Sequence, residues 1–165
     1  GTRADHLSTG EVRYRCGLYT MCRRTWPYPS MATFDAPSRE NCTFRRQPTN
    51  TPLQAYVTLN DPVYVEAAQA LGRRIIKEGG NSIDEKIKFG LELALARPAR
   101  KQDIAELRKL FETELAHYRA QESEALKLAT EPLGSLPEGL SAAEAAAWTV
   151  VANVLLNLDG VLTKG

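Results

Sequence analysis

From Thr51 onward, apolar residues recur every three or four positions and charged residues lie between them. This is the pattern of amphipathic helices that bury one face, and it predicts four of them. The predicted inner faces are Leu53, Tyr56 and Val57; Tyr64, Ala67, Ala68, Leu71 and Ile75; Ile83, Ile87, Leu91, Ala94 and Leu95; and Ile104, Leu107, Phe111, Leu115 and Tyr118. The fourth helix is expected to run unbroken from about Lys101 to Ala129.

A fifth helix is predicted over residues 145–162, where the chain is apolar nearly all round. A helix without a polar face is expected at the centre of a bundle. Asn153, Asn157 and Asp159 interrupt the run, and no stretch of eighteen apolar residues occurs in the chain. We therefore predict a buried core helix and no membrane span.

Helix starts are signalled by capping residues. Thr51 precedes Pro52, and Asp61 precedes Pro62, so both are expected to be N-caps with proline in the first turn. Ser82 and Ser141 each have Glu three residues later, which predicts two capping boxes. Gly79 and Gly80 are expected to end the second helix.

The first 50 residues lack such periodicity. We expect a loose arm over 1–14, a short helix over 15–25, an extended Trp26–Pro29 segment, one turn over 30–34 and at most a short strand at Cys42–Phe44. The prediction is an all-α fold: about five helices around the apolar C-terminal one, with an irregular N-terminal region of about 50 residues. Residues 1–165 are expected to form one domain, with 51–165 as helical core, that is a fragment of a larger protein.

Charge is unevenly distributed although the net charge is only +1. Residues 1–50 hold eight basic and four acidic residues, whereas residues 51–165 hold thirteen basic and sixteen acidic ones. All eight basic residues of the first part are Arg, which suits fixed bidentate pairing. They form no continuous basic stripe, so nucleic acid is not an expected partner.

Familiar catalytic signatures are missing from the sequence. The chain has two histidines, His6 and His117, and three cysteines, Cys16, Cys22 and Cys42, whose spacing fits no zinc site. We therefore predict no metal and no cofactor in this chain. The cysteines are interpreted as unbridged buried thiols, with a bridge from Cys42 to Cys16 or Cys22 as the alternative in an exported protein.

One polar cluster remains between the aromatic segment and the helices. Its candidate ligand-binding residues are Asp35, Arg39, Glu40, Arg45, Arg46, Asn50 and Gln54. In a structural interpretation, which we favour, these side chains pair with one another and with backbone groups of a bent segment. In a functional interpretation, the arginines bind a carboxylate, sulfate or phosphate and the carboxylates act as acid and base.

Several of these motifs resemble a known family. The matching segments are Leu18–Thr20, Arg23–Thr25, Phe34–Pro37, Arg39–Glu40, Cys42–Thr43, Arg45–Arg46, Thr49–Ala55, Leu59–Pro62, Ala67–Ala68, Ala147–Ala152 and Leu155–Asp159. They are similar to the C-terminal module of large exported proteins abundant in planctomycete bacteria, catalogued as domain of unknown function family 1553. Arg100 departs from the Thr or Ser that similar chains have before the long helix, so that helix is expected to start without a good cap.

The resemblance implies an extracytoplasmic protein, periplasmic or secreted, whose other modules include a haem-bearing one in many cases. It implies no activity, because none is established for the family. Our leading hypothesis is a non-catalytic scaffold or interaction module that contacts other modules of the same protein, or a protein or glycan partner. The alternative is a fragment of an enzyme that acts on acidic or sulfated glycans, with the Arg cluster as its anion site.

Overall fold

The computed structural model describes residues 29–36, 49 and 51–162. The chain divides into two compact units, residues 1–54 and 55–165. The prediction that they form one domain stays a prediction. The arm over 1–14, the short helix over 15–25, the Trp26–Tyr28 segment and the three cysteines lie outside the described residues, as does the strand proposed at 42–44.

The first unit contains α1 (Pro29–Thr33), at the place where one turn was predicted, and the start of α2 (Pro52–Asn60). After α1 the chain turns at Asp35, whose φ of 57° lies in the left-handed region. The N–H of Ala36 donates to the carbonyl oxygen of Met31 at 2.9 Å, five residues back. This combination is the Schellman motif, in which one left-handed residue follows the helix and lets the chain reverse.

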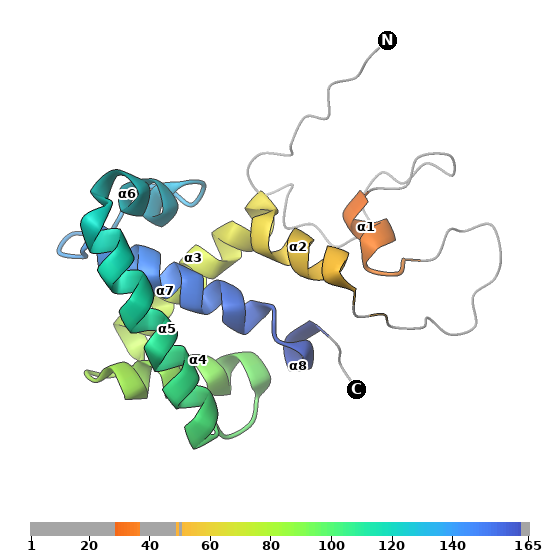
Figure 1. Cartoon of the computed structure of the whole chain (residues 1–165), viewed down its shortest axis with the longest axis horizontal. Helices are drawn as coiled ribbons and strands as arrows, with labels where there is room; N and C mark the ends of the chain where they lie inside the picture. The colour runs from red at the N-terminus through yellow and green to blue at the C-terminus, as the bar shows by residue number, and fades with distance from the viewer. Residues whose placement is uncertain (1–28, 37–48, 50, 163–165) are drawn as a thin grey trace, which may run out of the picture. The chain divides into compact units, whose positions relative to one another are not determined.

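The second unit holds the rest of the helices, which Figure 1 colours from yellow to blue. They are α3 (Pro62–Glu78), α4 (Ile83–Leu95), α5 (Lys101–Ala120), α6 (Glu122–Thr130), α7 (Ala142–Leu156) and α8 (Asp159–Leu162). The described residues thus contain eight helices and no strand. The all-α prediction is confirmed, and the larger number of helices comes from the short α1 and from two breaks in predicted helices.

One break divides the predicted helix over 101–129. Gln121 has φ −129° and ψ 71°, outside the helical region, so α5 ends at Ala120 and α6 begins at Glu122. The prediction of one helix was therefore wrong. The break lets α6 turn and contact α7, where Ala125 and Ala129 become almost fully buried. No Gly or Pro lies at this position. The contact of α6 with α7, and not local helix propensity, determines where the helix breaks.

The second break separates α7 from α8. The N–H of Asn157 bonds to the carbonyl oxygens of Asn153 and Val154, so the last turn tightens and the helix stops. The sequence had predicted one helix to residue 162. As predicted, α7 is the central helix, since α3, α4, α5 and α6 all contact it (Figure 1).

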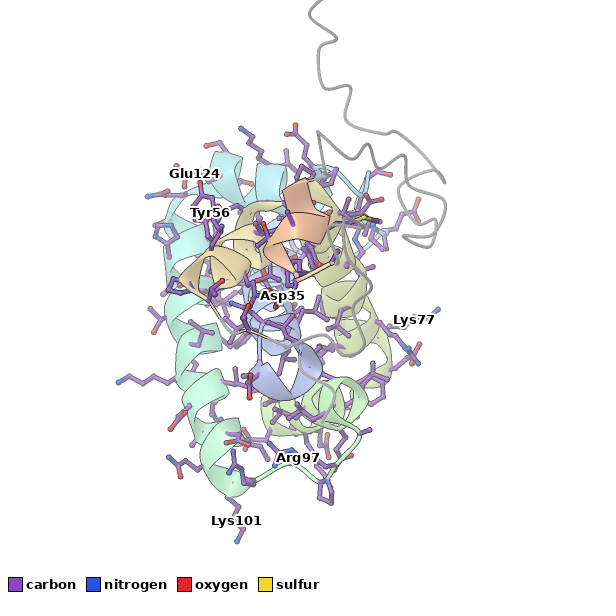
Figure 2. The ribbon with its side chains drawn as sticks, turned by 90° about the vertical axis from the view of Figure 1, so that its right-hand side faces the viewer. Asp35, Tyr56, Lys77, Arg97, Lys101 and Glu124 are labelled. Carbon is purple, nitrogen blue, oxygen red and sulfur yellow. The ribbon has the colours of Figure 1, made fainter. Side chains whose placement is uncertain are left out.

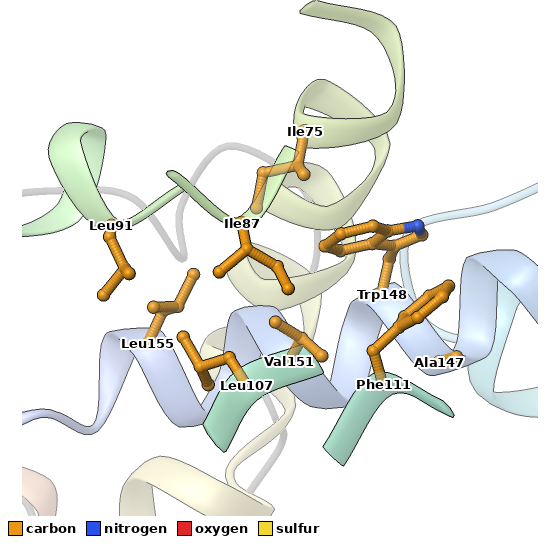
Figure 3. Packing of buried hydrophobic residues seen from close by; sticks show 9 residues of the cluster. All are labelled: Ile75, Ile87, Leu91, Leu107, Phe111, Ala147, Trp148, Val151 and Leu155. Atoms are coloured by element: carbon orange, nitrogen blue, oxygen red, sulfur yellow. The ribbon is translucent and has the colours of Figure 1, made fainter. Parts of the chain in front are cut away.

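The core lies around α7. Figure 3 shows its buried residues, which come from four helices: Ile75 of α3, Ile87 and Leu91 of α4, Leu107 and Phe111 of α5, and Ala147, Trp148, Val151 and Leu155 of α7. The rings of Phe111 and Trp148 pack with centroids 4.5 Å apart and planes tilted by 34°. Such aromatic contacts contribute beyond the area that they bury.

A close approach between α3 and α7 depends on Gly72. A Cβ atom at this position would lie 3.1 Å from the carbonyl carbon and oxygen of Trp148. That is tighter than ordinary van der Waals contact, and the obstacle is backbone, which cannot rotate away. Gly72 therefore sets how near the two helices come.

The predicted caps have different outcomes. Asp61 accepts a hydrogen bond from the N–H of Val63 at 2.9 Å, and Ser82 and Glu85 form both bonds of a capping box. The capping box predicted at Ser141 is not formed, since Ser141 makes no side-chain cap bond. Its intended partner Glu144 instead lies 3.6 Å from the ammonium group of Lys86. No side chain caps α5 at Arg100, as expected.

None of the helices in the described residues is long and apolar enough to cross a membrane.

Candidate functional site

The polar cluster singled out in the sequence is centred on Asp35, which is labelled in Figure 2 at the end of α1. One carboxylate oxygen, Oδ2, accepts hydrogen bonds from the backbone N–H of Thr49 at 2.8 Å and from its hydroxyl at 2.7 Å. The donors come from a position fourteen residues later in the chain. Asp35 therefore ties the turn after α1 to the segment that leads into α2.

These bonds shift the titration of Asp35. The pKa of its carboxyl is lowered from 3.8, first by the Thr49 hydroxyl, then by the Thr49 backbone N–H and, more weakly, by the amide of Gln54. Desolvation opposes the shift. Donors that favour the charged form keep the group ionised at neutral pH.

Gln54, in the first turn of α2, connects the same residues from the other side. Its side chain is 3 % exposed. The amide nitrogen donates to the carbonyl oxygen of Thr33 at 2.9 Å, to the hydroxyl of Thr49 at 3.0 Å and, at 3.4 Å, to Asp35. Both ends of this amide are used, because its oxygen accepts from the backbone N–H of Thr51 at 3.0 Å.

Thr51 and Gln54 also form a capping box at the start of α2. The N–H of Gln54 lies 3.3 Å from the hydroxyl of Thr51, and the N–H of Thr51 bonds to the Gln54 side chain. The pattern Thr-x-x-Gln carries this signal in the sequence, although only Thr51 was predicted as a cap. Together Asp35, Thr49, Thr51, Gln54 and the carbonyl group of Thr33 are called the Asp35 cluster below.

The other candidate residues are not tested by this arrangement. Arg39, Glu40, Arg45, Arg46 and Asn50 lie outside the described residues, so the predicted anion site stays a prediction. The structure brings together Asp35 and Gln54, and Thr49 links them. His117 is exposed and contacts Tyr118 edge to face, with ring centroids 5.0 Å apart.

In the second unit, a groove of about 510 Å³ lies among α4, α5, α7 and α8. Its aliphatic side chains are Leu91, Leu95, Leu107, Leu110, Val154 and Leu158, and its charged ones are Arg97, Arg100, Asp103, Glu106 and Asp159. Arg100 is neutralised by Asp103, whose carboxylate lies 3.0 Å from its Nε atom. An apolar floor of this kind suits an apolar group. Sequence reasoning missed it because four separate elements line it.

Within the part of the chain that the structure describes, no three His, Cys, Asp or Glu side chains come together in a way that could hold a metal ion. At the Asp35 cluster, side-chain donors and acceptors satisfy backbone groups of Thr33, Thr49 and Thr51.

Comparisons with known proteins place the chain in a family. No curated protein and no solved structure matches it. The family model PSD1, described as a protein of unknown function (DUF1553), matches residues 2–111, about two thirds of the chain. This match includes all of the described Asp35 cluster, α2 to α4 and the first half of α5. The chain therefore belongs to the PSD1 (DUF1553) family of proteins of unknown function.

Proposed function

We propose that the chain is a non-catalytic scaffold or interaction module of a secreted multidomain bacterial protein of the planctomycete type. The observation that carries the proposal is the bonding of Asp35. Its Oδ2 atom is occupied by two donors from Thr49, at 2.7 and 2.8 Å, and its neighbour Gln54 uses both ends of its amide within the chain. Side chains held in this way stabilise bends of the backbone.

The titration of Asp35 supports the same interpretation. A general acid at neutral pH needs a raised pKa, and an effective general base needs a pKa near the working pH. The Thr49 donors lower the pKa of Asp35 instead. Its carboxylate is therefore ionised and weakly basic, which suits a hydrogen-bond acceptor better than a proton-transfer group.

Exposed apolar side chains of the second unit support an interaction role. Tyr56 and Leu59 on α2 are 64 % and 41 % exposed, although both are large. Aromatic residues are enriched at the centres of protein interfaces. We assign this surface to contacts with other modules of the same protein or with a protein partner. The proposal places the protein outside the cytoplasm and assigns no cofactor to this chain; a haem-bearing module belongs elsewhere in the protein.

The test is to incubate the chain with acidic and sulfated glycans and to measure released reducing ends and sulfate, beside the variant Asp35→Asn. We expect no turnover by either protein and a lower melting temperature for Asp35→Asn, because Thr49 loses a charged acceptor. The enzyme alternative, with the Arg cluster as anion site, predicts turnover that Asp35→Asn abolishes. Turnover of that kind would refute our proposal.

A further inference from the structure

A second groove, in the unit formed by residues 55–165, has a different chemistry. It encloses about 410 Å³ between the C-terminal half of α3 and the segment before α7. We call it the α3 groove. It is lined by Arg73, Arg74, Ile76, Lys77, Glu78, Pro137, Glu138, Gly139 and Leu140.

Arg73 is fixed at this groove by neutral partners. Its Nη2 atom donates to the carbonyl oxygens of Ala129 and Gly134, at 2.9 and 2.6 Å. These two bonds hold the guanidinium group in place without neutralising its charge. In addition, its Nε atom is buried and has no acceptor among the described residues. The guanidinium is thus preorganised, and its Nη1 atom, which makes no hydrogen bond within the described residues, remains for a ligand.

Lys77 adds a second positive charge one turn further along α3. It is exposed and makes no ion pair within the described residues, and in Figure 2 its side chain extends away from the ribbon. Arg74 and Glu78 neutralise each other, with Nε and Oε2 2.9 Å apart. The remaining charges at the groove are Arg73 and Lys77 against Glu138, which leaves one positive charge in excess.

The rest of the lining determines what kind of anion fits. Ile76, Pro137 and Leu140 are apolar, so the ligand needs an apolar part beside its negative charge. No aromatic ring lines the groove on which a sugar ring would stack. These features favour an acidic peptide over a sulfated glycan.

We propose that the α3 groove binds an acidic peptide segment of a partner protein or module, with an Asp or Glu carboxylate at Arg73 and Lys77 and a neighbouring aliphatic side chain against Ile76, Pro137 and Leu140. This inference rests on the proposed function as an interaction module and names the chemistry of its partner. Charge complementarity determines the orientation of the bound peptide, and the apolar contact excludes water from the interface.

The experiment measures fluorescence anisotropy with the whole chain and a labelled peptide in which Leu and Glu alternate. We expect saturable binding, at least about tenfold weaker for the same peptide with Gln in place of Glu, and weaker at high salt because exposed charges are screened. Lys77→Glu should weaken binding at least about tenfold. The matched control Lys109→Glu alters an exposed lysine of α5 that does not line the groove, and it should leave affinity within about twofold.

A spectroscopic readout accompanies the affinity. On peptide addition, amide chemical shifts should change at residues 73–78 and 137–140 and not at α5. Absence of binding, equal binding of the Gln peptide, or equal loss in Lys109→Glu would each overturn the inference. So would binding of a chondroitin sulfate hexasaccharide in place of the peptide. The glycan turnover assay is independent of these outcomes, so a failed groove and a failed scaffold proposal are distinguishable.

Discussion

Thr49 donates both its backbone N–H and its hydroxyl to one oxygen of Asp35, at 2.8 and 2.7 Å. Because these bonds lower the pKa of Asp35 below 3.8, the folded state favours the ionised carboxylate. The stability that they supply is fully present above the unfolded pKa of about 3.9 and is lost as pH falls through the lower folded value.

The first prediction follows from the direction of this pH dependence. Asp35→Asn should melt at a lower temperature than the unchanged chain above about pH 5, because the charged acceptor is missing. Below the unfolded pKa the difference should shrink, since Asp35 then becomes protonated in the original chain as well. Melting curves of both proteins, followed by circular dichroism, measure this difference. A range of roughly pH 2.5 to 7 brackets the titration of the carboxyl. A difference that stays constant over the whole range would contradict the assignment of Thr49 as the cause.

The second prediction compares two serines at helix starts. Ser82→Ala should lower the free energy of unfolding by about 1 kcal/mol, because the N–H of Glu85 loses its acceptor. Ser141→Ala should change it by less than about 0.5 kcal/mol, since Ser141 makes no cap bond. Urea denaturation of the two variants gives both values. Equal losses would show that Ser141 caps α7 after all.

The third prediction concerns the close approach of α3 and α7. Gly72→Leu should lower the free energy of unfolding by about 1–3 kcal/mol, because its side chain meets the backbone of Trp148 and Thr149. Ala70→Leu, at an exposed position of the same helix, is the control and should cost less than about 0.5 kcal/mol. Should Gly72→Leu prove neutral, the helices would not be as close as the structure places them.

The fourth prediction tests a buried amide that fixes the loop before α7. Gln69 is 1 % exposed; its nitrogen donates to the carbonyl oxygens of Leu128 and Glu131, and its oxygen accepts from the N–H of Leu133. Gln69→Leu should lower the free energy of unfolding by about 1–3 kcal/mol, because it leaves these backbone groups without a partner.

The control for that variant is Gln102→Leu. Gln102 is an exposed helical residue whose amide donates to the carboxylate of Glu106 at 3.0 Å. It should change stability by less than about 0.5 kcal/mol. Urea denaturation distinguishes the pair, and similar losses for both would mean that the loop is not held by Gln69.

Features of the fold that depend on local spacing were predictable from the sequence. The caps at Asp61 and Ser82 and the apolar character of α7 each depend on residues close together in the sequence, and each has the predicted place in the structure. The break at Gln121 was not predictable, because the segment has ordinary helix formers and the cause is the contact of α6 with α7. Ser141 was mispredicted because Glu144 reaches Lys86 across to α4.

The candidate site shows the same distinction. Asp35 and Gln54 could be chosen as a polar cluster from their position between aromatic and helical segments. Their shared hydrogen bonding to Thr49 was not predictable. The contact between Asp35 and Thr49 spans fourteen residues and depends on the left-handed turn at Asp35. The two grooves were invisible to pattern analysis, because each gathers its lining from separate elements.

Amide hydrogen exchange tests most directly the claim that the Asp35 cluster supports the backbone. The N–H groups of Thr49 and Thr51 donate to Asp35 and to Gln54, respectively. We predict that both are protected in the original chain, that Asp35→Ala makes the Thr49 amide exchange about tenfold faster or more, and that Gln54→Ala does the same at Thr51. Unprotected amides in the original chain, or exchange rates that neither variant alters, would contradict the account.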